Sequence, residues 1–251
     1  MSKKNFAPKS LKDQVIVITG ATNGIGLACA KLAANRGAKV VMSSRNQKRL
    51  NQCVQEIMAD GGIAVGVTAD ASLSVDLELI KEAALSRFGE INTWVNNAVS
   101  SVQGYLHQTS LDEERALFDI NFWGTRMGSS LAVEVMKIHG GVLINLGSEV
   151  SVAPPPLLGM YNASKQAIAA FTEVLRSELR DQNIPIEVCL IRPTAIETDP
   201  TLAAEAILKC AEHPQRDVFV GGPAKLSAIV DTFFPKLKDI YAESQMKHLK
   251  D

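Results

Sequence analysis

Runs of apolar, β-branched residues alternate along the chain with segments in which apolar residues recur at helical spacing. The run Gln14–Thr19 (QVIVIT) is typical of a strand that is covered on both faces. Six further strands are predicted: Lys39–Ser43, Ile63–Ala69, Ile91–Asn96, Gly141–Gly147, Ile184–Ile191 and Asp217–Val220. The predicted helices are Gly24–Asn35, Gln47–Ala59, Leu73–Phe88, the long region Leu111–Ile138, Leu158–Asp181, Thr201–Glu212 and Lys225–Phe233.

Strands that alternate with helices predict an α/β fold, a doubly wound parallel sheet of about seven strands with helices on both faces. We find no internal repeat and no low-complexity linker that would divide the chain. We therefore expect a single domain over residues 1–251.

Composition narrows the class of protein. Of the 251 residues, 46% are hydrophobic and 21% are charged, as in a soluble globular protein. The net charge of -1 gives no general attraction to nucleic acid, so we expect no nucleic-acid partner. The N-terminus has no apolar run of a secretory signal and no segment reaches the length of a membrane span, so we expect a cytoplasmic protein. The cysteines are scattered and indicate free thiols with no metal site: Cys29, Cys53, Cys189 and Cys210.

A glycine-rich turn, TGATNGIG, follows the first predicted strand and opens the first helix. Gly20 permits a tight turn, Gly24 lets the backbone approach a pyrophosphate, and Gly26 lets the helix pack close to the sheet. Free N–H groups at the start of the helix would hold the anion. The position directly after a buried strand makes this pattern more specific than a glycine-rich turn alone.

The end of the second strand bears on the choice of cofactor. An acidic residue here would bind the ribose 2′-hydroxyl of NAD, but the chain has Ser44 and Arg45. Arg45 can pair with a 2′-phosphate and Ser44 can donate to it, which favours NADP. The alternative is that Arg45 is a solvated surface charge.

Tyr161 and Lys165 form a YxxxK pair whose spacing puts both side chains on one helix face. An ammonium about 5 Å away would stabilise the phenolate by about 3 kcal/mol, or roughly two pKa units. Ser148 ends the fifth strand, 13 residues before Tyr161, where ligands bind to parallel sheets. Ser100 and Ser151 are rival hydroxyl groups.

The TGxxxGxG turn, the Asn96-Asn97-Ala98 sequence and the Ser148–YxxxK spacing together resemble the short-chain dehydrogenase/reductase family over nearly the whole chain. The resemblance implies a Rossmann-like fold and a hydride transfer between NADP(H), with NAD(H) less favoured, and a carbonyl or secondary alcohol on a small or lipid-like substrate. It also implies a homodimer or homotetramer.

The resemblance further assigns roles to residues. It makes Tyr161 the proton donor or acceptor, Ser148 the group that orients the substrate oxygen, and Lys165 the group that tunes Tyr161 and holds the nicotinamide ribose. Asn121 would hold a water in a proton relay, and Asp70 would bind the adenine. The implied cofactor contacts are Gly20, Thr22, Asn23, Gly24, Ile25, Gly26, Ser44, Arg45, Asp70, Asn97, Ala98, Tyr161, Lys165, Ile196 and Thr198.

The chain departs from the family pattern at several points. Val99 and Thr194 stand where the family usually has glycine, and Asn23 stands where a basic residue often strengthens NADP preference. Almost no chain lies between Thr198 and the next predicted helix, which leaves little for a substrate lid.

Other functions stay open at this stage. Val99 and the short lid favour a catalytically silent NADP(H)-binding sensor or scaffold. An epimerase or dehydratase of the same fold usually has a longer C-terminal substrate domain. The tail Phe233–Tyr241 mixes apolar and basic residues; docking onto protein is the simpler interpretation and peripheral membrane contact the other.

Overall fold

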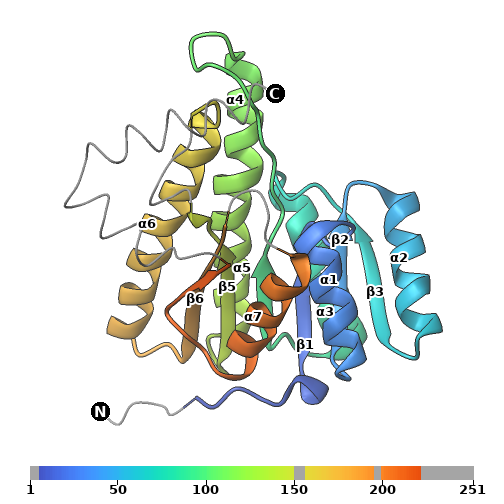
Figure 1. The fold of residues 1–251 in the computed structure, drawn as a ribbon. Helices are drawn as coiled ribbons and strands as arrows, with labels where there is room; N and C mark the ends of the chain where they lie inside the picture. The colour runs from blue at the N-terminus through green and yellow to red at the C-terminus, as the bar shows by residue number, and fades with distance from the viewer. Residues whose placement is uncertain (1–5, 150–155, 195–198, 222–251) are drawn as a thin grey trace.

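The computed structural model describes residues 6–149, 156–194 and 199–221. These residues form one parallel sheet of seven strands in the order β3-β2-β1-β4-β5-β6-β7 (Figure 1), which confirms the predicted fold class. The strands are β1 (Val15–Ile18), β2 (Lys39–Ser44), β3 (Ile63–Thr68), β4 (Thr93–Asn96), β5 (Gly141–Leu146), β6 (Ile186–Pro193) and β7 (Asp217–Val220).

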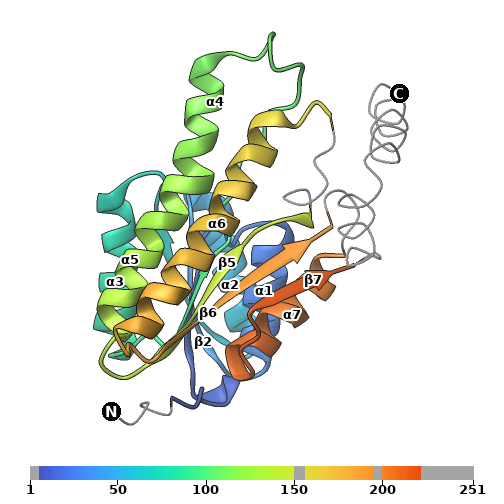
Figure 2. The ribbon, with the colours of Figure 1, turned by 90° about the vertical axis from the view of Figure 1, so that its left-hand side faces the viewer.

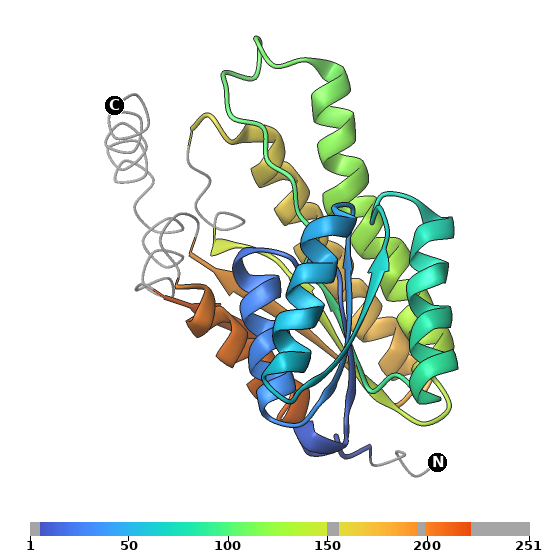
Figure 3. The same ribbon diagram turned by 90° about the vertical axis from the view of Figure 1, so that its right-hand side faces the viewer.

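Helices cover both faces of this sheet, as Figures 2 and 3 show from opposite sides. α1, α2 and α7 lie on one face, and α3, α5 and α6 on the other. None of the helices in the described part of the chain is both long and apolar enough to cross a bilayer. The helices are α1 (Gly24–Asn35), α2 (Gln47–Ala59), α3 (Ser74–Phe88), α4 (Leu111–Phe118), α5 (Gly124–Met136), α6 (Gly159–Asp181) and α7 (Pro200–Glu212).

Alternate residues of the central strands enter two separate apolar cores. In β1, Ile16 and Ile18 pack toward α1 and α2, while Val15 and Val17 pack toward α3 and α5. All four side chains are almost completely buried. Burial on both faces explains why the strands are uninterrupted apolar runs in the sequence.

The predicted helical region Leu111–Ile138 is confirmed as far as Met136, two residues short of its predicted end. A π-helical turn, Asp119–Trp123, separates α4 from α5, and α5 ends at Met136. The turn places Asn121 inside the protein, where it is completely buried and its carbonyl accepts a hydrogen bond from Thr125 Oγ1 at 2.7 Å. The predicted final helix, Lys225–Phe233, lies outside the described residues.

Several other element ends differ by one or two residues. β4 begins at Thr93 instead of Ile91, and the side chain of Asn92 just before it accepts the backbone N–H of Val15 at 2.7 Å. β6 continues to Pro193, which is paired with Val220 of β7. A short 3₁₀ turn before β1, Leu11–Asp13, was not predicted.

A polar network is buried between the sheet and the helices on one face. Trp94 Nε1 donates to Asn96 Oδ1 at 2.8 Å, and Asn96 Nδ2 donates to Asn145 Oδ1 at 2.9 Å. Asn145 Nδ2 in turn donates to Thr172 Oγ1 of α6 at 2.9 Å. The network therefore links β4, β5 and α6, and each bond satisfies a group that would otherwise be buried without a partner.

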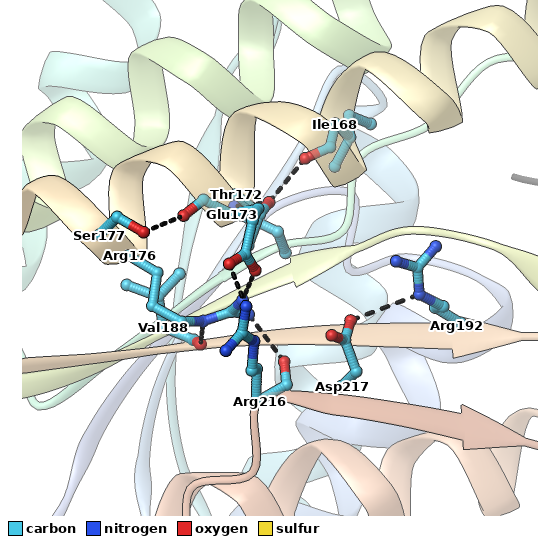
Figure 4. A network of polar contacts seen from close by, with 10 residues as sticks. Ile168, Thr172, Glu173, Arg176, Ser177, Val188, Arg192, Arg216 and Asp217 are labelled. Atoms are coloured by element: carbon cyan, nitrogen blue, oxygen red, sulfur yellow. Dashed lines mark hydrogen bonds and ion pairs between the residues drawn. The ribbon is translucent and has the colours of Figure 1, made fainter.

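A second network holds the edge strand β7 in place (Figure 4). Arg176 of α6 donates to the carbonyl of Val188 in β6 at 2.9 Å and to the carbonyl of Arg216 at 2.8 Å. Glu173 forms ion pairs with the side chains of both Arg176 and Arg216. Since Arg176 is 9% exposed, its bonds to backbone carbonyls fix the outer strands against α6.

We expect Gly128→Ala to destabilise the protein. A Cβ at this position of α5 would overlap Asn96 Oδ1 and lie 3.1 Å from Trp94 Nε1. Overpacking of this kind costs about 1–3 kcal/mol, which exceeds the gain of about 1 kcal/mol from replacing a helical glycine. Chemical denaturation should show a lower free energy of unfolding.

Ser130→Ala, at an exposed position of the same helix, is the matched control and should change stability by less than about 0.5 kcal/mol. A Gly128→Ala variant as stable as the wild type would contradict the tight packing of α5 on Asn96.

Candidate active site

The carboxyl ends of β1 and β4 meet at the point where the strand order reverses, and ligands bind there in open α/β sheets. A cavity of about 170 Å³ lies at this place. It brings together side chains from α1, the ends of β4 and β5, and α6, although they are far apart in the sequence. Its lining includes Ile25, Asn97, Val99, Ser148, Tyr161 and Lys165.

A larger cavity of about 570 Å³ lies elsewhere, between the N-terminal segment, the start of β4 and the end of α5. Its polar lining includes Lys9, Glu90 and His139. None of the predicted site residues lines it, so the smaller cavity is the candidate active site. The described part of the chain also contains no cluster of histidine, cysteine or acidic residues suited to a metal ion.

Hydrogen bonds hold the glycine-rich turn against the end of β4. Gly20 has a φ of +65°, and a Cβ there would lie 2.8 Å from the Cα of Ala98. Asn97 Nδ2 donates to the carbonyls of Thr19 and Gly20 at 2.8 and 3.0 Å. Thr19 Oγ1 accepts the N–H groups of Asn97 and Ala98, both at 3.0 Å. Thr19 is part of the motif, but the sequence alone predicts no role for it.

The start of α1 fits a pyrophosphate. Gly24 has a φ of +46°, and a Cβ there would meet nothing within 4 Å, so the backbone is open to a ligand. The side chain of Asn23 makes no capping hydrogen bond to the helix. The first N–H groups of α1 are therefore directed toward an open surface that suits an anion.

The end of β2 carries the residues expected to select the cofactor. Ser44 Oγ and Thr22 Oγ1 are hydrogen-bonded at 2.9 Å. Arg45 has a side chain that is 68% exposed, and its Nη1 lies 3.7 Å from Asp70 Oδ2. Burial raises the pKa of Asp70, but hydrogen bonds from Ser72 and the charge of Arg45 outweigh it and hold that pKa below its usual value.

Tyr161 faces Ser148 in the cavity. Burial raises the pKa of the Tyr161 phenol, and a hydrogen bond with Ser148 offsets only part of this increase. Ser148 Oγ also lies 3.5 Å from the carbonyl of Pro193. The phenol therefore keeps its proton at neutral pH.

Lys165 is 3% exposed and its Nζ donates to the carbonyl of Leu146 at 2.8 Å. Its Nζ lies 5.7 Å from the centre of the Tyr161 ring, and burial lowers the pKa of Lys165 to about 8. Burial is the dominant influence on the pKa of both groups, and the expectation that Lys165 lowers the pKa of Tyr161 stays a prediction. The ammonium is directed at a backbone carbonyl and not at the phenol oxygen.

Asn121 connects the segment after β4 to α6. Its Oδ1 accepts the N–H of Ser100 at 2.7 Å, and its Nδ2 donates to the carbonyl of Ser100 at 2.9 Å and to Ser164 Oγ at 3.0 Å. Ser164 Oγ donates to the carbonyl of Tyr161 at 2.7 Å. Ser164 was not among the predicted site residues, and Ser100 contributes its backbone to these contacts. A serine inside a motif helix gives no sequence signal for such a contact.

Some predicted residues cannot be placed. Ile196, Thr198 and Ser151 lie outside the described residues. Val99 is 55% exposed and Thr194 is partly buried, and both line the candidate cavity. The two departures from the family pattern therefore meet at the same place as Tyr161.

Comparison with known proteins agrees with this geometry. The short chain dehydrogenase profile matches residues 14–206. The uncharacterized oxidoreductase YxnA of Bacillus subtilis (strain 168) is 39% identical over 270 residues, which cover 98% of this chain and 76% of YxnA. A solved metagenomic short-chain oxidoreductase in complex with NADP is 28% identical, with a TM-score of 0.75 over 84% of this chain and 98% of that one.

A short chain dehydrogenase/reductase from Burkholderia phymatum, solved in complex with NAD, has a TM-score of 0.86 over 92% of this chain and 96% of its own. At 22% identity this likeness concerns the fold. The chain belongs to the short-chain dehydrogenase/reductase family, a class of oxidoreductases that use a nicotinamide cofactor.

We expect Lys165→Met to stabilise the protein at neutral pH, by about 2 kcal/mol, because it removes a buried ammonium. The pKa of Lys165 is about 8 in the folded protein against the ordinary 10.5. The unfolded chain therefore binds more protons between these values, and the stability of the wild type rises with pH across that window. The difference in the free energy of unfolding between the variant and the wild type should therefore shrink from pH 8 to 10.5.

Urea denaturation at several pH values would measure this difference. Lys48→Met, at an exposed position of α2, is the control and should show no such convergence. If Lys165→Met is less stable than the wild type at pH 7, the hydrogen bond to Leu146 outweighs the burial of the charge.

Proposed function

We propose that this protein is an NADP(H)-dependent oxidoreductase that reduces a carbonyl, or oxidises a secondary alcohol, on a small or lipid-like substrate. One observation carries the proposal: Ser148, Tyr161 and Lys165 line a single cavity at the carboxyl ends of the strands. When bound, the nicotinamide ring supplies or accepts the hydride.

The side chains then have separate tasks. Tyr161 transfers a proton between its hydroxyl and the substrate oxygen, and Ser148 donates a hydrogen bond that orients this oxygen. Because burial raises the pKa of Tyr161, the phenol is protonated at neutral pH, which is the form required to give a proton to a carbonyl oxygen. Lys165 would hold the ribose hydroxyls once it leaves the carbonyl of Leu146.

The role of Asn121 in a proton relay stays a prediction. The π-helical turn supports it, since such turns often mark functional positions. The contacts of Asn121 with Ser100 and Ser164 give it a positioning role as well. Through Ser164 it steadies the backbone of Tyr161.

The entrance to the cavity supports an apolar substrate. Val99 and Leu106 are 55% and 60% exposed. A Cβ at Gly159, two residues before Tyr161, would touch Leu106, so this side chain lies beside the start of α6. An apolar rim next to a single proton donor suits a carbonyl on a hydrophobic body.

A preference for NADP(H) rests on Ser44 and Arg45. The end of β2 has no carboxylate for a ribose 2′-hydroxyl, while Arg45 offers an exposed guanidinium to a 2′-phosphate. The related structures were solved with NADP in one case and NAD in another. NAD(H) is the less favoured cofactor.

A catalytically silent NADP(H)-binding sensor or scaffold is the second candidate. The cavity of about 170 Å³ is smaller than usual ligand pockets of about 300–1,000 Å³, and Val99 takes part of its space. Tight cofactor binding without turnover on any carbonyl would favour this candidate.

A homodimer or homotetramer remains the expected assembly. Large apolar side chains are exposed on the helices that extend past the sheet in Figure 2: Leu111, Trp123 and Val174. Contact with a second copy would cover apolar surface of this kind.

Tyr161→Phe should lower kcat for carbonyl reduction by about 10²–10⁴-fold, since the substrate oxygen loses its proton donor. NADPH binding, followed by fluorescence titration, should persist. Tyr105→Phe is the control, because its hydroxyl does not line the cavity and should leave kcat unchanged. Near wild-type turnover by Tyr161→Phe would remove Tyr161 from the mechanism.

Arg45→Ala should weaken NADPH binding by about tenfold to a hundredfold, the usual range for a hydrogen bond to a charged group. NADH binding should change little, because NADH has no 2′-phosphate. Arg36→Ala removes the same charge from the far end of α1, where Arg36 pairs with Glu205, and serves as the control. Equal losses for NADPH and NADH would show that Arg45 does not select the cofactor.

A further inference from the structure

Arg45 does not stand alone at the end of β2. In the sheet, Ser44 lies opposite Thr68 of β3, and the N–H of Ala69 donates to the carbonyl of Ser44 at 3.1 Å. This register brings the next residues of both strands together. As a result, Arg45 Nη1 lies 3.7 Å from Asp70 Oδ2.

Asp70 is the fixed member of this pair. Its Oδ1 accepts hydrogen bonds from the N–H of Ser72 at 2.9 Å and from Ser72 Oγ at 2.7 Å. Its own N–H donates to Asp76 Oδ2 at 2.7 Å. The side chain of Asp70 is 26% exposed, whereas that of Arg45 is 68% exposed. The guanidinium is therefore the group that can move away.

Neighbouring basic side chains also have acidic partners. Lys31 Nζ lies 2.8 Å from Glu56, and Arg49 lies 3.5 Å from the same carboxylate. The charges of Arg45 and Arg49 are thus partly balanced within the protein. A 2′-phosphate, which adds about -1.5 to -2 units of charge, must compete with an acidic side chain for Arg45.

We propose that Asp70 competes with the 2′-phosphate of NADP(H) for Arg45. This competition reduces the ratio of the affinity for the phosphorylated cofactor to that for the unphosphorylated one. The inference rests on the proposed function, because it concerns the same cofactor site. Arg45 must turn from Asp70 to meet the phosphate, and the fixed carboxylate then repels the phosphate. A cofactor without the 2′-phosphate neither competes with Asp70 for Arg45 nor is repelled by the carboxylate. Asp70 therefore acts as a specificity-determining residue.

The test compares two small probes, adenosine 2′,5′-bisphosphate and 5′-AMP, by isothermal calorimetry on the full chain. Asp70→Asn keeps an oxygen that can accept the bonds from Ser72 but removes the charge. We expect the ratio of the two affinities to rise about fivefold in favour of the bisphosphate, and the gain to shrink at high salt. Asp60→Asn, at the other end of β3, makes the same change in net charge and should leave the ratio unaltered.

A double-mutant cycle separates competition for Arg45 from simple repulsion. In a protein that also carries Arg45→Gln, Asp70→Asn should produce a clearly smaller rise in the ratio of the two affinities. An equal gain in both backgrounds, or equal changes for the two probes, would overturn the proposal. If Asp70→Asn fails to fold, Asp70→Ser repeats the test, since serine also offers an uncharged acceptor.

The outcome also distinguishes this inference from the proposed function. A wild-type protein that binds neither probe, nor NADPH, nor NADH would refute the cofactor site itself. A wild-type protein that binds NADPH and reduces a carbonyl, with an unchanged ratio in Asp70→Asn, would leave the function intact and reject the role of Asp70.

Discussion

The contact between the turn after β1 and the end of β4 is the constraint on which the site depends. The side chain of Asn97 donates hydrogen bonds to the carbonyls of Thr19 and Gly20. In the other direction, Thr19 Oγ1 accepts the N–H groups of Asn97 and Ala98 after β4. β1 and β4 are neighbours at the point where the strand order reverses, so the loops that follow them lead to opposite faces of the sheet. These hydrogen bonds fix the base of the opening between the two loops, and the side chains of the candidate cavity lie above it.

Buried polar groups extend this rigid base toward Tyr161. The amides of Asn96 and Asn145 link the two central strands to α6, and Asn121 links α6 to the segment after β4. Each of these groups is buried and hydrogen-bonded, so any displacement would leave a polar group without a partner. Tyr161 and Ser148 are thereby held on elements that cannot shift independently.

Much of the fold could be predicted from the sequence, because strands buried on both faces are uninterrupted apolar runs and helices with one apolar stripe show a clear period. The π-helical turn could not, since its cause is the burial of Asn121 among groups that are distant in sequence. For the site, spacing identified Tyr161 and Lys165, but spacing does not report burial. The direction of the Lys165 ammonium and the rise in the pKa of Tyr161 depend on the packing around them.

Because Asn121 binds the backbone of Ser100 and not its side chain, residue 100 can be replaced without loss of these two hydrogen bonds. In the same segment, Val99 lines the cavity, and Val99 and Leu106 are both exposed. Substitutions in this segment can therefore change the exposed surface while the residues beneath keep their positions. The fold separates a replaceable surface from a fixed interior through a single asparagine.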